Sequence, residues 1–137
     1  MKKSKVFNVA IVGGGPGSKA IIDIILDKRL SQLPMKLIGI ADPDPEAVGY
    51  RYAKEKGIFA TEDYKALYKL KDLDMLIELT GREEVANEIA QNKPKHVRMM
   101  DHMAAYLFWD IFQIEEQRIA ERTRAEAALQ EAGDVLS

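Results

Sequence analysis

The fold is decided by the stretch Val9-Ala10-Ile11-Val12-Gly13-Gly14-Gly15-Pro16-Gly17-Ser18-Lys19-Ala20. Its four leading apolar residues are typical of a strand buried on both faces of a parallel sheet. The glycines that follow let the backbone turn sharply and approach a ligand without interference from a Cβ atom. Isoleucines after the turn predict a helix from about Gly17 to Leu30. The order of strand, glycine turn and helix predicts a phosphate site at the helix N-terminus.

Two registers of the dinucleotide fingerprint G-x-G-x-x-[GA] are possible within the turn. Gly13-x-Gly15-x-x-Ser18 places a serine at the third glycine position, where helix and strand pack closely. Gly15-x-Gly17-x-x-Ala20 matches the form but begins too far beyond the strand. We therefore favour the first register, and a tight turn without a ligand is the alternative.

An acidic residue downstream strengthens the nucleotide interpretation. The run 36–41 reads as the second strand, and Asp42 follows it at the position where a carboxylate meets the ribose hydroxyls of an adenine dinucleotide. A 2′-phosphate would meet negative charge there, because Asp44 and Glu46 follow and no arginine does. The pattern predicts NAD rather than NADP as the cofactor.

The rest of the chain to residue 103 repeats the strand–helix alternation. Asp44 is expected to cap a helix that ends at Gly57, and Thr61 to cap one that ends at Leu70. Further strands are expected at 58–60, 74–80 and 96–100, with a helix after Gly81. The alternation predicts an α/β, Rossmann-like, doubly wound parallel sheet of five strands in the order 3-2-1-4-5.

Composition excludes several classes of protein. The 137 residues carry a net charge of −2, so no basic surface indicates nucleic-acid binding. Cysteine is absent, which excludes disulfides and thiolate metal sites. No signal peptide or membrane span is recognisable, and a cytoplasmic protein is expected.

Residues 104–137 are predicted to form one long helix outside the sheet domain. Its first part is rich in bulky apolar side chains, and its second part is too polar for a globular core. One seam with a period near 3.5 contains two charged members and alanines, which makes a weak coiled coil. A homodimer through this helix is expected, with a solvated terminal helix as the alternative. The seam is Ile111, Ile114, Arg118, Glu121, Ala125, Ala128 and Ala132.

The sheet domain resembles the nucleotide-binding half of the glucose–fructose oxidoreductase and inositol dehydrogenase family. The resemblance lies in the glycine turn after Val9–Val12, in the run 40–47 and in the segments 56–58, 61–64 and 74–77. It implies contacts of Gly13, Gly15 and Asp42 with the dinucleotide and places Thr80 near the nicotinamide. The complete set of expected cofactor-binding residues is Gly13, Gly15, Pro16, Gly17, Ser18, Asp42, Thr80 and Gly81.

Two departures from that family bear on function. Family enzymes follow the fifth strand with Glu-Lys-Pro and its catalytic lysine, whereas this chain has residues 99–103 without lysine. The substrate domain of the family is also absent from these 137 residues. The tail 122–132 resembles the signalling helix that precedes PAS or kinase domains in bacterial sensor proteins.

Three functions are therefore weighed. We favour a non-catalytic NAD(H)- or nucleotide-binding sensory module of a larger cytoplasmic signalling protein. The alternatives are an NAD(P)-dependent oxidoreductase, or its cofactor-binding fragment, and an oligomerisation scaffold with a decayed nucleotide site.

Three polar residues near strand ends remain to be explained. Glu78 is a carboxylate inside an interior strand, so it is expected to face a ligand crevice or to pair with Arg82 or Arg98. Asp101 and His102 follow the fifth strand, and we favour a role in closing the strand and capping the next helix over acid–base catalysis. No catalytic residue and no metal site are predicted.

Overall fold

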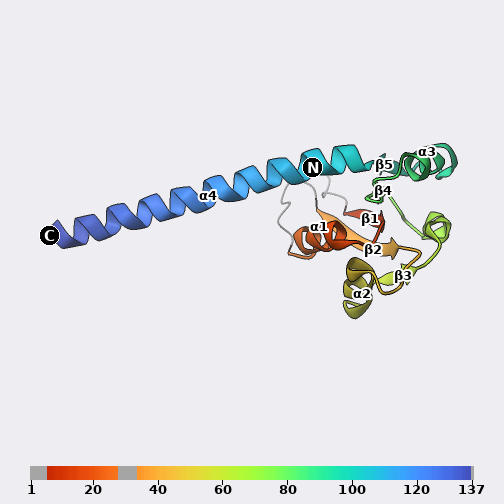
Figure 1. Ribbon diagram of the computed structural model, residues 1–137, viewed down its shortest axis with the longest axis horizontal. Helices are drawn as coiled ribbons and strands as arrows, with labels where there is room; N and C mark the ends of the chain where they lie inside the picture. Colours follow the sequence, from red (N-terminus) through yellow and green to blue (C-terminus); the bar gives the residue numbers. More distant parts are fainter. Residues whose placement is uncertain (1–5, 28–33, 137) are drawn as a thin grey trace, which may run out of the picture. The chain divides into compact units, whose positions relative to one another are not determined.

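The computed structural model describes residues 6–27 and 34–136 (Figure 1). Strands and helices alternate along the chain as the sequence pattern indicates. The strands are β1 (Phe7–Val12), β2 (Met35–Ala41), β3 (Phe59–Thr61), β4 (Met75–Glu78) and β5 (Arg98–Met100). The helices are α1 (Pro16–Leu26), α2 (Val48–Glu55), the 3-10 helix η1 (Tyr64–Lys69), α3 (Glu83–Asn92) and α4 (His102–Leu136).

The five strands form one parallel sheet in the order β3-β2-β1-β4-β5. This order confirms the prediction. In the central pairs, Val12 lies opposite Ala41 of β2 and opposite Glu78 of β4. The carboxyl ends of β1, β2 and β4 therefore meet at one edge of the sheet. The strand order reverses beside β1, because β2 and β3 lie on one side of it and β4 and β5 on the other.

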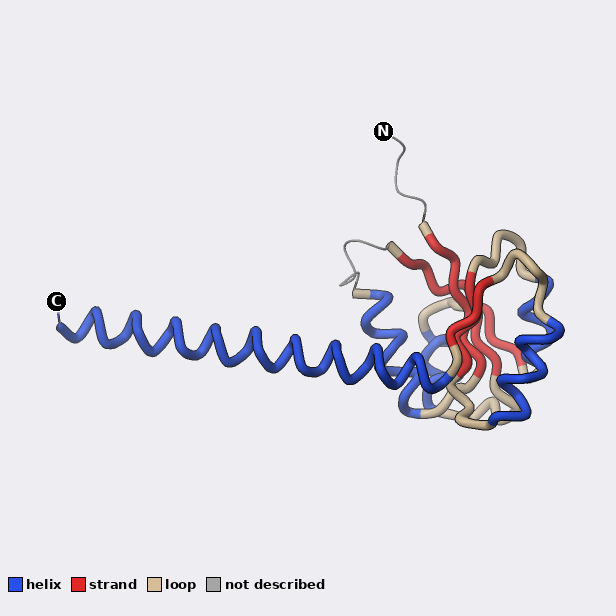
Figure 2. Tube along the Cα trace, turned by 90° about the horizontal axis from the view of Figure 1, so that it is seen from above, coloured by secondary structure: helices blue, strands red, loops and turns tan. Residues whose placement is uncertain are grey.

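Helices cover both faces of the sheet (Figure 2). Alternate residues of β1 point to opposite sides, so Val9 and Ile11 belong to one buried cluster and Ala10 and Val12 to another. The first cluster includes residues of α1 and α2, and the second includes residues of η1 and α3. The domain is therefore doubly wound.

Several element boundaries differ from the sequence prediction. Helix α2 begins at Val48, because the Asp44 carboxylate accepts from the N–H of Glu46 in a local turn instead of capping a helix. The segment after β3 is a 3-10 helix capped by Asp63 rather than an α-helix capped by Thr61. Helix α1 ends at Leu26, and the expected end at Leu30 lies outside the described residues.

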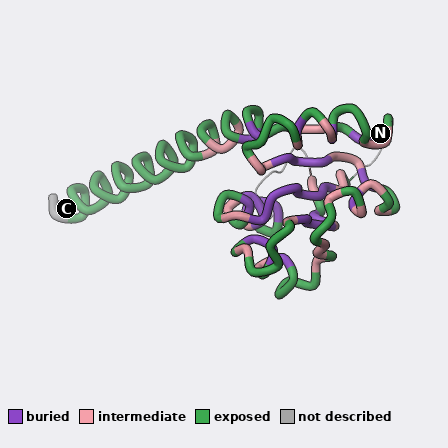
Figure 3. Tube along the Cα trace, turned by 45° about the vertical axis from the view of Figure 1, so that its right-hand side comes forward, coloured by how far each residue is buried: buried purple, intermediate pink, exposed green. Residues whose placement is uncertain are grey.

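Contacts divide the chain into two units, Met1–Ala105 and Tyr106–Ser137. Buried residues follow the strands and the sheet-facing sides of the helices in the first unit (Figure 3). In the second unit every residue from 113 to 134 is exposed. Within the described residues, no helix combines the length and the apolarity that crossing a membrane would require.

Candidate functional site

The first two glycines of the turn are required by the fold. Gly13 has φ +113°, and a Cβ there would lie 3.0 Å from the backbone of both Leu79 and Thr80. A Cβ on Gly14 would lie 3.0 Å from the Cβ of Asp42. Tight packing at the strand ends therefore accounts for both positions without a ligand.

Gly15 and Gly17 have no such structural reason. Gly15 has φ −74°, which any residue adopts, and Gly17 is not among the described residues with positive φ. A Cβ on either would meet no described atom within 4 Å, apart from its chain neighbours and its own helix. These two glycines leave open the space in front of the α1 N-terminus.

Backbone donors face that space. Within the described part of the chain, neither the N–H of Gly15 nor that of Gly17 makes a hydrogen bond to another residue. Pro16 between them is the first residue of α1 and has no N–H. Free N–H groups and the positive end of the helix dipole favour an anion here.

Ser18 fills the third glycine position in an unexpected way. Its side chain is buried, and its hydroxyl donates to the carbonyl of Gly15 at 2.6 Å. Helix α2 leaves room for this side chain because residue 49 is a glycine. A Cβ on Gly49 would lie only 1.8 Å from the Ser18 Oγ. Ser18 is therefore a packing residue between α1 and α2 in the free protein.

Asp42 lies beside the turn, as the sequence predicts. One carboxylate oxygen accepts from the N–H of Gly14 at 2.7 Å, and the other accepts from the N–H of Asp44 at 2.8 Å. A carboxylate has about four acceptor sites. Asp42 is thus held in place by the backbone and retains capacity to accept from ligand hydroxyls.

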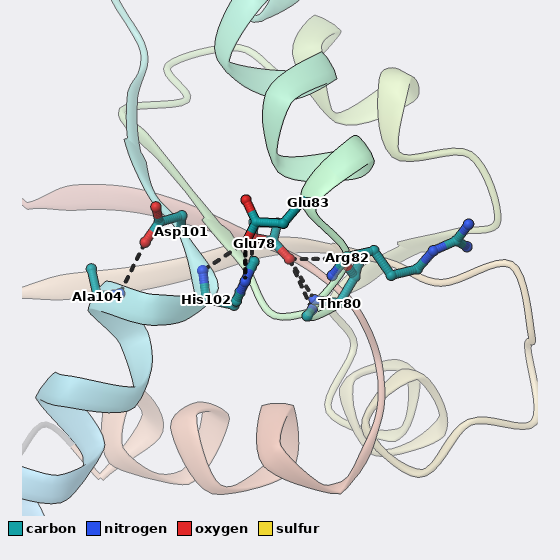
Figure 4. A network of polar contacts seen from close by, with 8 residues as sticks. Glu78, Thr80, Arg82, Glu83, Asp101, His102 and Ala104 are labelled. Atoms are coloured by element: carbon teal, nitrogen blue, oxygen red, sulfur yellow. Dashed lines mark hydrogen bonds and ion pairs between the residues drawn. The ribbon is translucent and has the colours of Figure 1, made fainter.

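Thr80 and Gly81 lie on the loop after β4, next to Gly13, and their donors serve Glu78 (Figure 4). Oε2 of Glu78 accepts from the Thr80 N–H at 2.8 Å, the Thr80 hydroxyl at 2.7 Å and the Gly81 N–H at 3.1 Å. These bonds explain why β4 ends at Glu78 instead of continuing to Thr80. Contact of Thr80 and Gly81 with a nicotinamide stays a prediction.

The partner of Glu78 is His102, so the predicted pairing with Arg82 or Arg98 is wrong. Oε1 of Glu78 lies 2.6 Å from the imidazole Nδ1 and accepts from the His102 backbone N–H at 3.0 Å. Arg82 instead pairs with Glu84 at 2.7 Å, and Arg98 lies over the ring of Phe7.

The environment shifts the pKa of both partners. Burial raises the pKa of Glu78, but hydrogen bonds from Thr80 and His102 outweigh it and hold the pKa below its usual value. The hydrogen bond to Glu78 raises the pKa of His102, against the effect of burial, and the nearby Glu83 raises it further. Both shifts favour the ion pair.

Both imidazole nitrogens of His102 are engaged by carboxylates. Nε2 lies 2.9 Å from Oε1 of Glu83, at the start of α3. The cap of α4 is Asp101, whose Oδ1 accepts from the N–H of Ala104 at 2.9 Å. The favoured capping role is therefore carried by Asp101, while His102 lies buried between two carboxylates. Sequence reasoning found Glu78 and His102 separately but had no signal that joins them.

A hollow of about 940 Å³ lies elsewhere in the first unit, Met1–Ala105, which we call the sheet unit. It is lined by the first residues of β2, the end of α1 and the segment 56–59. These elements lie at the amino ends of the strands, opposite the glycine turn. Its size therefore gives no support to the nucleotide site.

The strand order, the two covered faces and the glycine turn at the carboxyl edge define a Rossmann-like α/β domain. Comparisons with known protein families and with curated protein sequences gave no match. Among solved structures, homoserine dehydrogenase of S. aureus, crystallised at pH 7.0, is similar with 15% identity and a TM-score of 0.49. The match covers 73% of this chain and 33% of that enzyme, so this chain spans about a third of its length.

Proposed function

We propose that the sheet unit is a non-catalytic NAD(H)-binding regulatory module. The observation that carries the proposal is the pair Gly15 and Gly17, whose lack of side chains serves no purpose in the free protein. Their N–H groups and the α1 N-terminus would receive the pyrophosphate, and Asp42 would receive the adenosine ribose. The engagement of His102 by two carboxylates supports binding rather than proton transfer.

Alanine substitutions at these glycines test the proposal. Gly17→Ala should leave the free energy of unfolding unchanged or raise it by up to about 1 kcal/mol, because alanine favours the helix and meets no atom. Gly15 is the N-cap of α1, where glycine is preferred over alanine, so Gly15→Ala should lower the free energy of unfolding by about 1 kcal/mol or less. Both should weaken NAD binding at least about tenfold in calorimetric titration, because the methyl group blocks the phosphate.

The matched control is Gly133→Ala, which adds the same methyl group in open space at an exposed position of α4. Equal NAD affinity in the wild type and both glycine variants would contradict the site. Reduction of NAD by a sugar or polyol would contradict the non-catalytic part of the proposal.

The charge of Asp42 should select NAD over NADP. A 2′-phosphate would face this carboxylate, so we expect NAD to bind more tightly by at least about tenfold, or about 1.4 kcal/mol. Asp42→Asn removes the charge and keeps one oxygen acceptor, and should narrow this gap. Titration of both nucleotides measures it, with Asp110→Asn, the same change at an exposed position of α4, as control. An unchanged preference in Asp42→Asn would remove the carboxylate from the ribose site.

The helix beyond Ala105 is proposed to pair with a second copy of the chain and to transmit the bound state. Leu107, Ile111 and Ile114 follow the 4-3 spacing of a coiled-coil seam and are 63%, 53% and 56% exposed. A row of exposed apolar side chains of this kind favours association.

A further inference from the structure

Glu78 joins two segments of the sheet unit that are far apart in sequence (Figure 4). Its Oε2 accepts three hydrogen bonds from Thr80 and Gly81, on the loop after β4. Its Oε1 accepts from the backbone of His102, the first residue of α4, and contacts the imidazole. Both oxygens belong to one planar carboxylate, so this side chain links the position of the loop to that of His102.

The other side of this loop touches the glycine turn. A Cβ on Gly13 would lie 3.0 Å from Leu79 and from Thr80, so the turn approaches the loop as closely as only a glycine allows. The N–H of Leu79 also donates to the carbonyl of Val12 at 2.7 Å, directly before the turn. A ligand that shifts the turn therefore acts on the loop through this close approach and this hydrogen bond.

The start of α4 is also attached to α3, because His102 Nε2 contacts Glu83 at 2.9 Å. Of its residues 102–105, only His102 and Ala105 are buried, whereas Met103 and Ala104 are exposed. Ala105 lies in an apolar cluster, and Asp101 caps the helix. Glu78 thus supplies the polar bonds that hold the first residue of α4 to the sheet.

We propose that Glu78 is a positioning residue that couples the glycine turn, through the loop 79–81, to the first turn of α4. The inference rests on the proposed function for its ligand, which is NAD(H). The chain of contacts from Gly13 to His102 is continuous, and Glu78 is the group through which it passes.

A glutamine at position 78 separates the two sides of the network. Its carbonyl oxygen can still accept from Thr80 and Gly81, whereas its NH2 group cannot accept from the His102 N–H. Glu78→Gln therefore weakens the bond to α4 and retains those to the loop. Glu84→Gln makes the same chemical change at an exposed carboxylate and is the matched control.

Amide hydrogen exchange on the intact chain, with and without saturating NAD, measures the coupling. In the wild type and in Glu84→Gln, NAD should change the exchange rates of residues 102–105 by about fivefold or more, the lower end of usual coupling between sites. In Glu78→Gln, NAD should still bind by calorimetry but leave these rates unchanged. An equal response in Glu78→Gln would overturn the proposal. His102→Gln removes the imidazole end of the same pair and takes its place if Glu78→Gln does not fold.

A measurement without ligand separates this inference from the proposed function. Thr80→Val removes one of the three hydrogen bonds at Oε2, together with the bond that Thr80 Oγ1 accepts from the exposed Arg82 N–H. It should speed exchange at residues 102–105 by about fivefold. It should add no further change in a Glu78→Gln background. If NAD fails to bind the wild type, the proposed function is lost, and this second measurement decides the coupling. Unchanged exchange in Thr80→Val would overturn it.

Discussion

Glu78 is a fully buried carboxylate on an interior strand, a position that is unfavourable for a charge without partners. Four hydrogen bonds and the contact with the His102 imidazole offset that cost. Replacement by leucine would leave these donors without an acceptor, and breaking a buried pair in this way typically costs about 3–5 kcal/mol. The network is therefore a main determinant of the carboxyl edge of β4.

The ion pair should make stability depend on pH. The raised pKa of His102 gives stability that is fully present below its usual value of 6.5 and is lost as pH rises through the higher pKa of the folded state. The lowered pKa of Glu78 gives stability that is present above its usual value of 4.5 and is lost as pH falls through the lower folded value. The contribution of the pair should be greatest between these two usual values.

Urea unfolding from acid to alkaline pH measures this dependence. His102→Gln should abolish the decline in stability above neutral pH. His96→Gln removes the other histidine, which is exposed, and should keep the wild-type profile. The assignment fails if the decline persists in His102→Gln.

The packing of α1 against α2 depends on one serine and one glycine. The Ser18 hydroxyl is fixed by its bond to the Gly15 carbonyl, and the N–H of Gly49 donates to the Gly14 carbonyl at 2.6 Å. The two helices therefore meet directly behind the glycine turn. Serine can occupy the third glycine position of the fingerprint because the residue that faces it on α2, Gly49, has no side chain.

Gly49→Ala should destabilise the domain by about 3 kcal/mol, the upper end for overpacking. Its Cβ would lie 1.8 Å from the Ser18 Oγ and 2.9 Å from the carbonyl oxygen of Gly14. Ser18→Ala in the same chain should restore part of the loss, because the closest of these contacts disappears. Urea unfolding of the single and double variants measures the coupling. Gly17→Ala is the control, since it adds the same methyl group in open space.

A neutral Gly49→Ala would show that the helices separate readily. A double variant no more stable than Gly49→Ala would show that the backbone contact, not the serine, sets the limit.

The unit Tyr106–Ser137 has little to bury by itself. Its exposed apolar side chains include Leu107, Ile111 and Ile114, and a single helix offers no core to cover them. Pairing with a second copy would cover this seam, and the polar remainder of the helix would then add specificity rather than stability.

We expect the intact chain to be a dimer in light scattering at micromolar concentration. Serine at the three exposed apolar positions Leu107, Ile111 and Ile114 should give a monomer with the sheet unit still folded. Gln113→Ser with Gln130→Ser changes exposed positions off the seam and should keep the dimer. An intact chain that is monomeric would contradict the pairing.

Local patterns were sufficient to determine the strand order and the position of the glycine turn. Apolar runs, glycines and helical periodicity are read within a few residues, and right-handed crossovers then restrict how parallel strands are arranged. Asp42 was found in the same way, because the end of β2 fixes its place beside the turn. The start of α2 was not predicted correctly. Asp44 and Pro45 match the sequence pattern of a helix start, but the helix begins at Val48, where the Gly49 N–H bonds to the Gly14 carbonyl.

Only the tertiary structure decided what Glu78 and His102 do. They are 24 residues apart, and nothing local distinguishes a histidine partner from an arginine partner for a buried carboxylate. The same holds for Ser18, because a serine fits at this position only if the facing residue of another helix is a glycine. Sequence patterns report propensity and periodicity along the chain, whereas pairing across the sheet depends on which side chains the fold brings within hydrogen-bond distance.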